Sequence, residues 1–264
     1  MIYYKTYDEI ELLRKSNMLV AKTHGEIAKV IKAGMTTQDL DKIAEEFILD
    51  NGGKPGFKGY NNFPSTLCIS VNDEVVHGMP GDRELTDGDL VSVDCGVLMN
   101  GFYGDSAYTY SIGKMSEQAL ELMKITKESL YKGIEAAVIG NRVGDIGYAV
   151  QQHAESHGFS VVRDLVGHGV GRNLHEKPEV PNYGKQGSGV MLKEGMVIAI
   201  EPMINAGTYT VKGLKDGWTI VTSDGALSAH YEHSIAITPN GADILSSFQF
   251  CEEVLKKNQP VLVH

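Results

Sequence analysis

The sequence has few cysteines and no segment typical of a nucleic-acid surface or a membrane span. Cys68, Cys95 and Cys251 are widely spaced and odd in number, so they form neither a disulfide framework nor a Cys-x-x-Cys zinc site. The net charge of -10 comes without a lysine and arginine block, which argues against nucleic-acid binding. No apolar run could cross a bilayer, and the N-terminus lacks a signal-peptide core. We therefore expect a cytoplasmic protein that binds neither nucleic acid nor membrane.

One pattern occurs twice, at 85–94 and 192–201. Each copy runs from leucine through an acid and a glycine into an apolar strand that ends on a carboxylate. The first strand ends at Asp94 and the second at Glu201, an offset of 107 positions (94 to 201). A carboxylate on an apolar strand is costly unless its charge is compensated. The repeat therefore predicts a two-fold structure that brings these acids together around a cation.

Helical patterns repeat at nearly the same offset. Apolar periodicity and capping signals predict helices from Thr6 to near Gly34 and over 37–50 in the first half. They predict helices over 116–140 and about 143–157 in the second half. Each half is thus two helices followed by strands, and two copies of about 110 residues predict a pseudo-symmetric α/β (α+β) fold.

We expect one domain. No proline- or serine-rich linker separates the halves, so a single domain should span 1–245, with halves at about 1–110 and 111–245. The 42% of hydrophobic residues suffices for a large core. The pattern is lost in 246–264, which we expect to be a C-terminal tail, either a short helix or a loose segment.

The first carboxylate strand belongs to a predicted hairpin. Asn100-Gly101 between two apolar strands is typical of a type I′ turn. That turn places Asp105 opposite Gly96, which makes Asp94 and Asp105 diagonal neighbours with Cβ atoms about 7 Å apart. Both carboxylates could then clamp a cation. The alternative is that they are acids of an exposed turn.

The second half supplies two more acids. Glu201 ends an apolar strand, and Glu232 begins the strand 232–238 as the counterpart of Asp105. Four carboxylates in a small volume cannot all stay ionised without cations. A pair of divalent metal ions would remove this conflict.

Two histidines precede the carboxylate strands, and each is followed by glycine. These are His77 and His168, and glycine lets the backbone approach a site closely. The segment 167–175 has two histidines separated by glycines, unlike a helical His-Glu-x-x-His zinc site. The other histidines lack such a context and are expected to be structural or at the surface: His24, His153, His157, His230, His233 and His264.

An oxygen-rich shell with one or two imidazoles suits Mn²⁺, Co²⁺ or Fe²⁺ better than a structural zinc site. The residues alone therefore predict a two-metal hydrolytic centre. A bridging hydroxide would be the nucleophile, and the acids would be ligands and base.

These residues, in this order, resemble the type I methionine aminopeptidases in their short bacterial form. The matching motifs lie at 68–80, 93–105, 167–178, 200–203 and 231–233, and the similarity extends over 4–243. The resemblance implies the pita-bread (creatinase/aminopeptidase) fold, two pseudo-two-fold-related halves of helices packed on a curved antiparallel sheet. It also implies removal of the N-terminal methionine from newly made polypeptides, with a preference for a small second residue.

The same resemblance implies a set of site residues. The ligands of two divalent ions, Co, Mn or Fe with Zn as an alternative, would be Asp94, Asp105, His168, Glu201 and Glu232. Asp105 and Glu232 would contact both metals, Glu201 would also move the proton, and the catalytic His77 and His175 would contact the scissile amide. The methionine pocket would be lined by Phe57, Tyr60, Phe63, Cys68, Leu174 and Trp218, since a thioether packs well on aromatic rings. For the aromatics, ordinary core packing is the alternative.

Two other functions compete with this one. Xaa-Pro dipeptidases and aminopeptidase P use the same scaffold, but they add an N-terminal domain for which the segment before residue 57 is too short. A non-enzymatic protein with this fold should have lost its ligands, and here all are present. We expect a monomer whose partners are the N-termini of nascent polypeptides, with the ribosome as a candidate contact.

Overall fold

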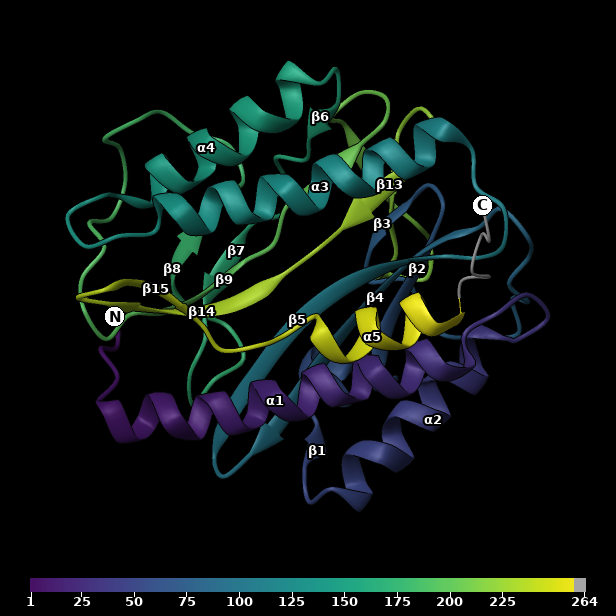
Figure 1. The fold of residues 1–264 in the computed structure, drawn as a ribbon, viewed down its shortest axis with the longest axis horizontal. Coiled ribbons are helices and arrows are strands. Elements are labelled where there is room, and N and C mark those ends of the chain that lie inside the picture. The colour runs from purple at the N-terminus through teal and green to yellow at the C-terminus, as the bar shows by residue number, and fades with distance from the viewer. Residues whose placement is uncertain (259–264) are drawn as a thin grey trace.

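The computed structural model describes residues 1–258, in which two helices followed by a run of strands occur twice and a short helix comes last (Figure 1). The elements of the first half are α1 (Tyr7–Val30), α2 (Thr37–Asp50), β1 (Lys54–Pro55), the 3-10 helix η1 (Tyr60–Asn62), β2 (Leu67–Val71), β3 (Glu74–Val76), β4 (Leu90–Met99) and β5 (Phe102–Ser111). Those that follow are α3 (Glu117–Ala136), α4 (Val143–Ser156), β6 (Ser160–Val161), β7 (Gly167–Gly169), β8 (Glu176–Val180), β9 (Val197–Ile200), β10 (Met203–Asn205), β11 (Val211–Gly213), β12 (Ile220–Thr222), β13 (Ser228–His230), β14 (His233–Thr238), β15 (Gly241–Ile244) and α5 (Gln249–Asn258).

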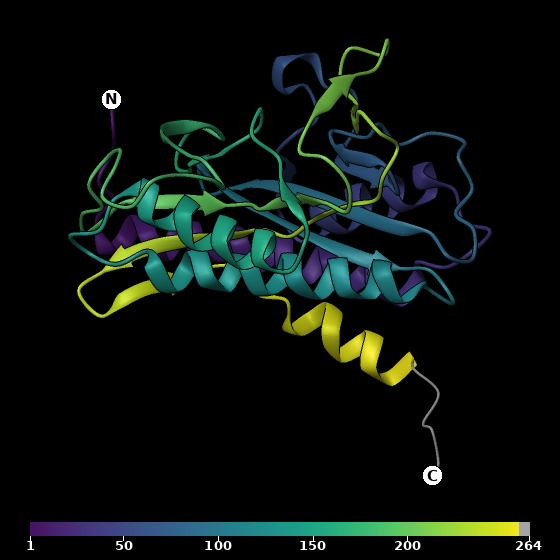
Figure 2. The same cartoon turned by 90° about the horizontal axis from the view of Figure 1, so that it is seen from above.

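The strands form two larger and two smaller sheets. One larger sheet has the order β1-β4-β2 with β5 paired to β4, and the other has the order β15-β14-β9-β7-β8. The smaller sheets are β13-β10-β6 and β11-β12-β3. Helices α1, α3 and α4 lie on one side of the sheets, and the β11–β12 hairpin (light green) rises from the other side (Figure 2). None of the helices in residues 1–258 has the length and apolarity of a membrane span.

Both long helices end earlier than the sequence suggested. The capping box that begins α1 is present, since the Glu9 N–H donates to Thr6 Oγ1 and the Thr6 N–H donates to Glu9 Oε2. However, α1 ends at Val30 and not near Gly34, and α3 ends at Ala136 rather than at 140. The segment after each helix does not continue the helix, because its backbone hydrogen-bonds to the segment that precedes the carboxylate strand of the same half.

The predicted repeat is present in the backbone. The Gly34 N–H donates to the Leu85 carbonyl at 2.8 Å, and the Gly140 N–H donates to the Leu192 carbonyl at 3.3 Å. Both glycines adopt positive φ, +84° and +94°, which favours glycine at these positions. Equivalent residues of the two halves therefore make equivalent contacts, as the 106–107 offset predicts.

The β4–β5 hairpin has the predicted register. Gly96 pairs with Asp105, and Asn100 and Gly101 have φ of +53° and +79°, as a type I′ turn requires. The outer edge of β5 contacts the second half directly, where the Glu232 N–H donates to the Ala107 carbonyl at 2.9 Å. The two acid-bearing segments thus meet at the joint between the halves.

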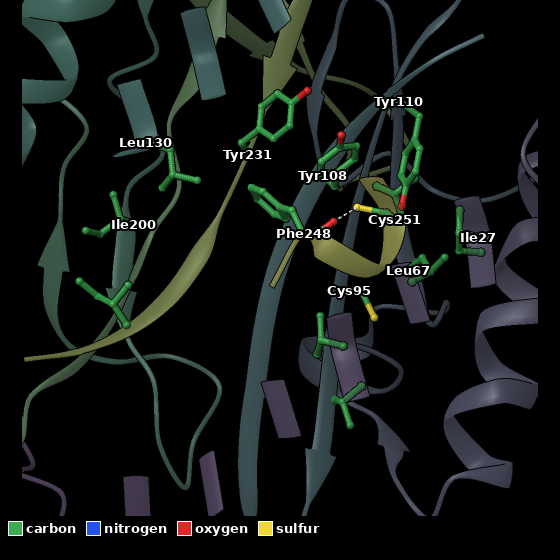
Figure 3. Close-up of a cluster of buried hydrophobic side chains, with 14 of the residues drawn as sticks. Ile27, Leu67, Cys95, Tyr108, Tyr110, Leu130, Ile200, Tyr231, Phe248 and Cys251 are labelled. Carbon is green, nitrogen blue, oxygen red and sulfur yellow. Dashed lines mark hydrogen bonds between the residues drawn. The ribbon is translucent and has the colours of Figure 1, made fainter. Parts of the chain in front are cut away.

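One hydrophobic core continues through both halves. Its members include Ile27 and Leu67 from the first half and Leu130 and Ile200 from the second (Figure 3). Burial of such side chains contributes about 1.5–3 kcal/mol each. The two halves are therefore packed as one body around the site.

Helix α5 covers the edge of this core. Its residue Cys251 is buried beside Tyr108 and Tyr110 and donates its S–H to the Phe248 carbonyl at 3.0 Å (Figure 3). Of the two forms expected for 246–264, the short helix is therefore present at Gln249–Asn258. Residues 259–264 of the predicted tail lie outside the described residues.

Candidate active site

All the side chains predicted for the site line one cavity of about 340 Å³. They are Asp94, Asp105, His168, Glu201, Glu232, His77, His175, Phe57, Tyr60, Phe63, Cys68, Leu174 and Trp218. The charged residues come from β4, β5, β7 and the junctions β9–β10 and β13–β14, so strands of both halves bring them together. The cavity has a polar part made by the carboxylates and imidazoles and an apolar part made by the aromatic side chains.

The polar part has distances that suit a metal ion. One ligand atom from each of Asp105, His168 and Glu232 lies within 4.8 Å of the others, and all three residues are buried. The Nε2 of His168 lies 3.7 Å from Asp105 Oδ2 and 3.5 Å from Glu201 Oε1. Two atoms bound to one ion at about 2.1 Å each are separated by roughly 3–3.5 Å. These atoms are therefore close to the spacing of shared ligands.

The hydrogen bonding of His168 leaves its other nitrogen free for a metal. Its Nδ1 lies 3.0 Å from the Gly169 carbonyl, to which it donates. The neutral imidazole then carries its lone pair on Nε2, the atom that faces the carboxylates. Burial, with a smaller effect of His175, lowers the pKa of His168 to about 3, which keeps the ring neutral.

The four carboxylates lie in one cavity, where Asp105 and Glu232 are buried and Asp94 and Glu201 are half-buried. Burial raises the pKa of Asp94 to about 7. Burial and then the charge of Asp94 raise the pKa of Glu201 well above its usual value. The pKa values of Asp105 and Glu232 are raised in the same way, first by burial and then by their acidic neighbours. A cation would reverse these shifts.

Three carboxylate oxygen atoms of the cluster show whether these residues could bind a metal ion. Asp94 Oδ1, Asp105 Oδ1 and Glu232 Oε1 are buried with no hydrogen-bond partner. Buried polar atoms in folded proteins almost always have a partner, and no protein donor reaches these three. Carboxylate oxygens with one imidazole are a donor set that divalent transition metals accept. The cluster therefore fits divalent metal.

The glycines around the two histidines are required by close backbone contacts. A Cβ at Gly167 would lie 2.4 Å from the Ala199 carbonyl oxygen, and one at Gly78 would lie 2.2 Å from the Ile69 oxygen. A Cβ atom cannot lie this close to a backbone oxygen, so a larger residue at either position would displace the neighbouring segment. The glycines thus let neighbouring backbone segments pack closely, and their role in approach to a bound substrate stays a prediction.

His77 and His175 face the cavity as neutral rings. Burial, followed by the charge of His175, lowers the pKa of His77 to about 4, and burial lowers the pKa of His175. His77 has a φ of +58°, an uncommon conformation for a residue other than glycine that clusters at functional sites. The Nδ1 of His175 lies 2.8 Å from the Tyr60 hydroxyl, which orients the ring.

The apolar part of the cavity is an aromatic cluster. Phe57, Phe63, Cys68 and Leu174 are buried together, and the Trp218 ring meets Phe63 edge-on at 5.1 Å. A Cβ at residue 96 would lie 2.4 Å from the Phe57 ring, so glycine in β4 makes room for this wall. These side chains pack against one another and also bound the cavity, so packing and binding are compatible here.

Several lining residues were not predicted. They are Asn61, Val76, Asp164, Leu165, Val166 and Met203. Val76 and Met203 could have been found, because each lies one or two positions from a predicted residue, His77 and Glu201 respectively. Nothing in the sequence pattern indicates Asp164 or Leu165, which reach the cavity through the loop before β7.

Five of the six remaining histidines lie among the described residues, and they fall into two groups. His24, His230 and His233 are buried, whereas His153 on α4 is partly exposed and His157 directly after α4 is exposed. His264 lies outside the described residues. His230 is closer to the site than expected, since its Nε2 lies 3.8 Å from Glu201 Oε2. Its sequence neighbours did not indicate this approach, because His230 ends β13 and Glu201 follows β9, two segments far apart in the chain.

Comparisons with known proteins agree with this arrangement. The model of metallopeptidase family M24 matches residues 11–239. A methionine aminopeptidase of Clostridium perfringens is 55% identical over 246 residues, which is 93% of this chain and 99% of that protein. The crystal structure of methionine aminopeptidase from Thermotoga maritima superposes with a TM-score of 0.92 at 47% identity, over 94% of this chain and all of that one. The prolidase from Pyrococcus furiosus superposes with a TM-score of 0.75 at 26% identity, over 92% of this chain and 65% of that chain.

Proposed function

This chain belongs to metallopeptidase family M24 and, within it, to the methionine aminopeptidases, and from that premise we propose how its residues act. Its fold is the pita-bread fold shared with those relatives. It is a metal-dependent hydrolase that removes the N-terminal methionine of polypeptides. The prolidase-like alternative is not favoured, because identity is 55% to a methionine aminopeptidase and 26% to the prolidase.

One observation supports the residue roles most strongly. A cluster of carboxylates with orphaned oxygens and an aromatic pocket occupy the same cavity. A peptidase that removes methionine needs a hydrolytic centre within one residue's length of a pocket for an unbranched thioether. Both are present side by side.

We propose that two divalent ions, Mn, Co or Fe with Zn as an alternative, are held by the acidic cluster. The ligands would be Asp94, Asp105, His168, Glu201 and Glu232. Asp94, Asp105 and Glu232 each have a buried oxygen with no hydrogen-bond partner, which supports their role as ligands. When bound, the ions supply Lewis acidity and a water of lowered pKa.

The protein residues have distinct tasks around that centre. Glu201 would take up the proton of the attacking water and deliver it to the leaving amine, because its carboxylate borders the cavity beside His168. His77 and His175 hold the scissile amide with their neutral rings and stabilise the charge that develops on its oxygen. The aromatic cluster holds the methionine side chain.

We also propose the cellular setting that this activity implies. The substrates would be N-termini of nascent polypeptides with a small second residue, met in the cytoplasm, with the ribosome as a candidate contact. The chain would act as a monomer. The net charge of -10 supports the monomer, since a net charge far from zero disfavours self-association.

Peptide specificity tests the proposal. Met-Gly-x, Met-Lys-x and x-Pro peptides are incubated with protein loaded separately with Mn²⁺, Co²⁺, Fe²⁺ or Zn²⁺, and the products are identified by mass spectrometry. We expect release of methionine from Met-Gly-x well above the other two peptides. Selective cleavage of the x-Pro peptide would reject the proposal.

A further inference from the structure

His230 lies directly behind the proposed proton-transfer residue. It ends β13, where it pairs with Met203 of β10, and the pair His233–Ile200 of β14 and β9 continues the same register. Extended across the two residues between these ladders, that register has Glu232 opposite Glu201. In an antiparallel pair, directly opposed residues and those two positions away share a face. His230 and Glu201 are therefore diagonal neighbours on the face that carries the site.

The ring of His230 has an unsatisfied nitrogen. Its backbone is fixed, because the His230 N–H donates to Thr109 Oγ1 at 3.1 Å and the Thr109 hydroxyl donates to the His230 carbonyl at 2.7 Å. The side chain is 1% exposed, and its Nε2 has no hydrogen-bond partner. A buried nitrogen of this kind is rare in folded proteins and calls for a specific partner.

The acceptor that this nitrogen faces is Glu201. The carboxylate lies between two imidazoles, with Oε1 at 3.5 Å from His168 Nε2 and Oε2 at 3.8 Å from His230 Nε2. His168 borders the cavity, whereas His230 does not. His230 therefore does not border the cavity, and the carboxylate that its Nε2 faces at 3.8 Å is that of Glu201.

We propose that His230 is a positioning residue that donates its Nε2–H to Glu201 Oε2 and so directs Oε1 into the cavity. A movement of about 1 Å brings the 3.8 Å separation into hydrogen-bond range. Hydrogen bonds to an ionised acceptor are short and strong, so the bond selects one orientation of the carboxylate. The inference rests on the proposed role of Glu201 in proton transfer.

A matched pair of variants separates hydrogen bonding from packing. His230→Gln keeps an N–H donor at similar reach, and His230→Met has similar length and no donor. We expect His230→Met to lower kcat on a Met-Gly-x peptide by about 10- to 100-fold, as misplacement of a reacting group does. KM should stay within about twofold, bound metal should be unchanged, and His230→Gln should recover most of the loss.

Three results would overturn the inference. His230→Met with wild-type kcat would show that the bond is not needed. Equal impairment of both variants would indicate a packing role, and loss of bound metal in either would indicate a different role in the metal site. Should His230→Met not fold, His230→Phe keeps a planar ring without a donor and replaces it in the same comparison.

A double-mutant cycle with Glu201→Gln links the effect to its target. If His230 acts through Glu201, adding His230→Met to Glu201→Gln lowers kcat no further. A further loss as large as that of the single variant would reject the inference alone. Near-normal turnover of Glu201→Gln with metal bound would instead reject the proposed role of Glu201, so the two failures can be told apart.

Discussion

Lys5 and Glu176 form an ion pair with 2.6 Å between Nζ and Oε2, and their side chains are only 5% and 3% exposed. The pair ties the start of the chain to the first residue of β8, directly after His175. A buried pair is costly to break from one side, because the remaining charge stays in the interior without a partner. This contact therefore holds the segment that carries one of the proposed catalytic histidines.

Lys5→Ala should lower the free energy of unfolding by about 3–5 kcal/mol. The matched control is Lys177→Ala, because Lys177 pairs with Glu179 at the surface with both side chains more than half exposed. That control should cost less than about 1 kcal/mol. Urea unfolding of both variants measures the difference, and equal values would contradict the assignment of the buried pair.

Metal binding should depend on pH because the ligands carry protons when no metal is bound. The pKa of Asp94 is raised to about 7 and those of the other three carboxylates are raised well above their usual values. Below these pKa values each ion must displace protons, so affinity falls as the pH falls. Between pH 8 and pH 6 we expect a loss of about tenfold or more, measured by calorimetric titration with Mn²⁺. An affinity that does not change over this range would contradict the raised pKa values.

Glu201→Gln should lower kcat by about 10²- to 10⁴-fold, as expected when a positioned acid–base group is removed. The amide keeps the shape of the side chain but cannot take up a proton. Metal content is measured in parallel, since Glu201 is also a proposed ligand. Near-normal turnover with metal bound would contradict the proton-transfer role.

His77→Ala separates substrate contact from metal binding. His77 lines the cavity, and its proposed contact is with the scissile amide and not with the metal. We therefore expect bound metal to be retained while turnover falls by roughly 10²-fold or more, the usual effect of losing one stabilising donor. If metal were lost together with activity, His77 would have to be reassigned as a ligand.

Some parts of the structure could be predicted because local geometry determines them. Asn100-Gly101 permits one tight two-residue turn, so Asp105 had to lie opposite Gly96. The offset of the two halves likewise made Gly34 and Gly140 equivalent. The helix ends were missed because Val30 and Ala136 are followed by backbone bonds to distant segments, which periodicity does not show.

The parts that could not be predicted depend on contacts between distant segments. His230 is opposite Met203 because β10 and β13 pair, and its sequence neighbours give no sign of the 3.8 Å approach to Glu201. The bond between Tyr60 and His175 joins residues from the two halves, and Asp164 reaches the cavity through an irregular loop. Motifs that contain the proposed ligands and catalytic residues can be recognised in the sequence. The residues that orient them cannot, because tertiary packing determines which distant residues come into contact.

Metal-dependent release of methionine is the measurement that tests the central conclusion most directly. Protein stripped by a chelator is supplied with increasing Mn²⁺, and methionine released from a Met-Gly-x peptide is followed together with bound metal. We expect no release without metal, recovery as the sites fill, and loss of both binding and recovery in Asp105→Asn. Methionine release at a normal rate by protein shown to contain no metal would contradict the assignment of the buried carboxylate cluster as the hydrolytic centre.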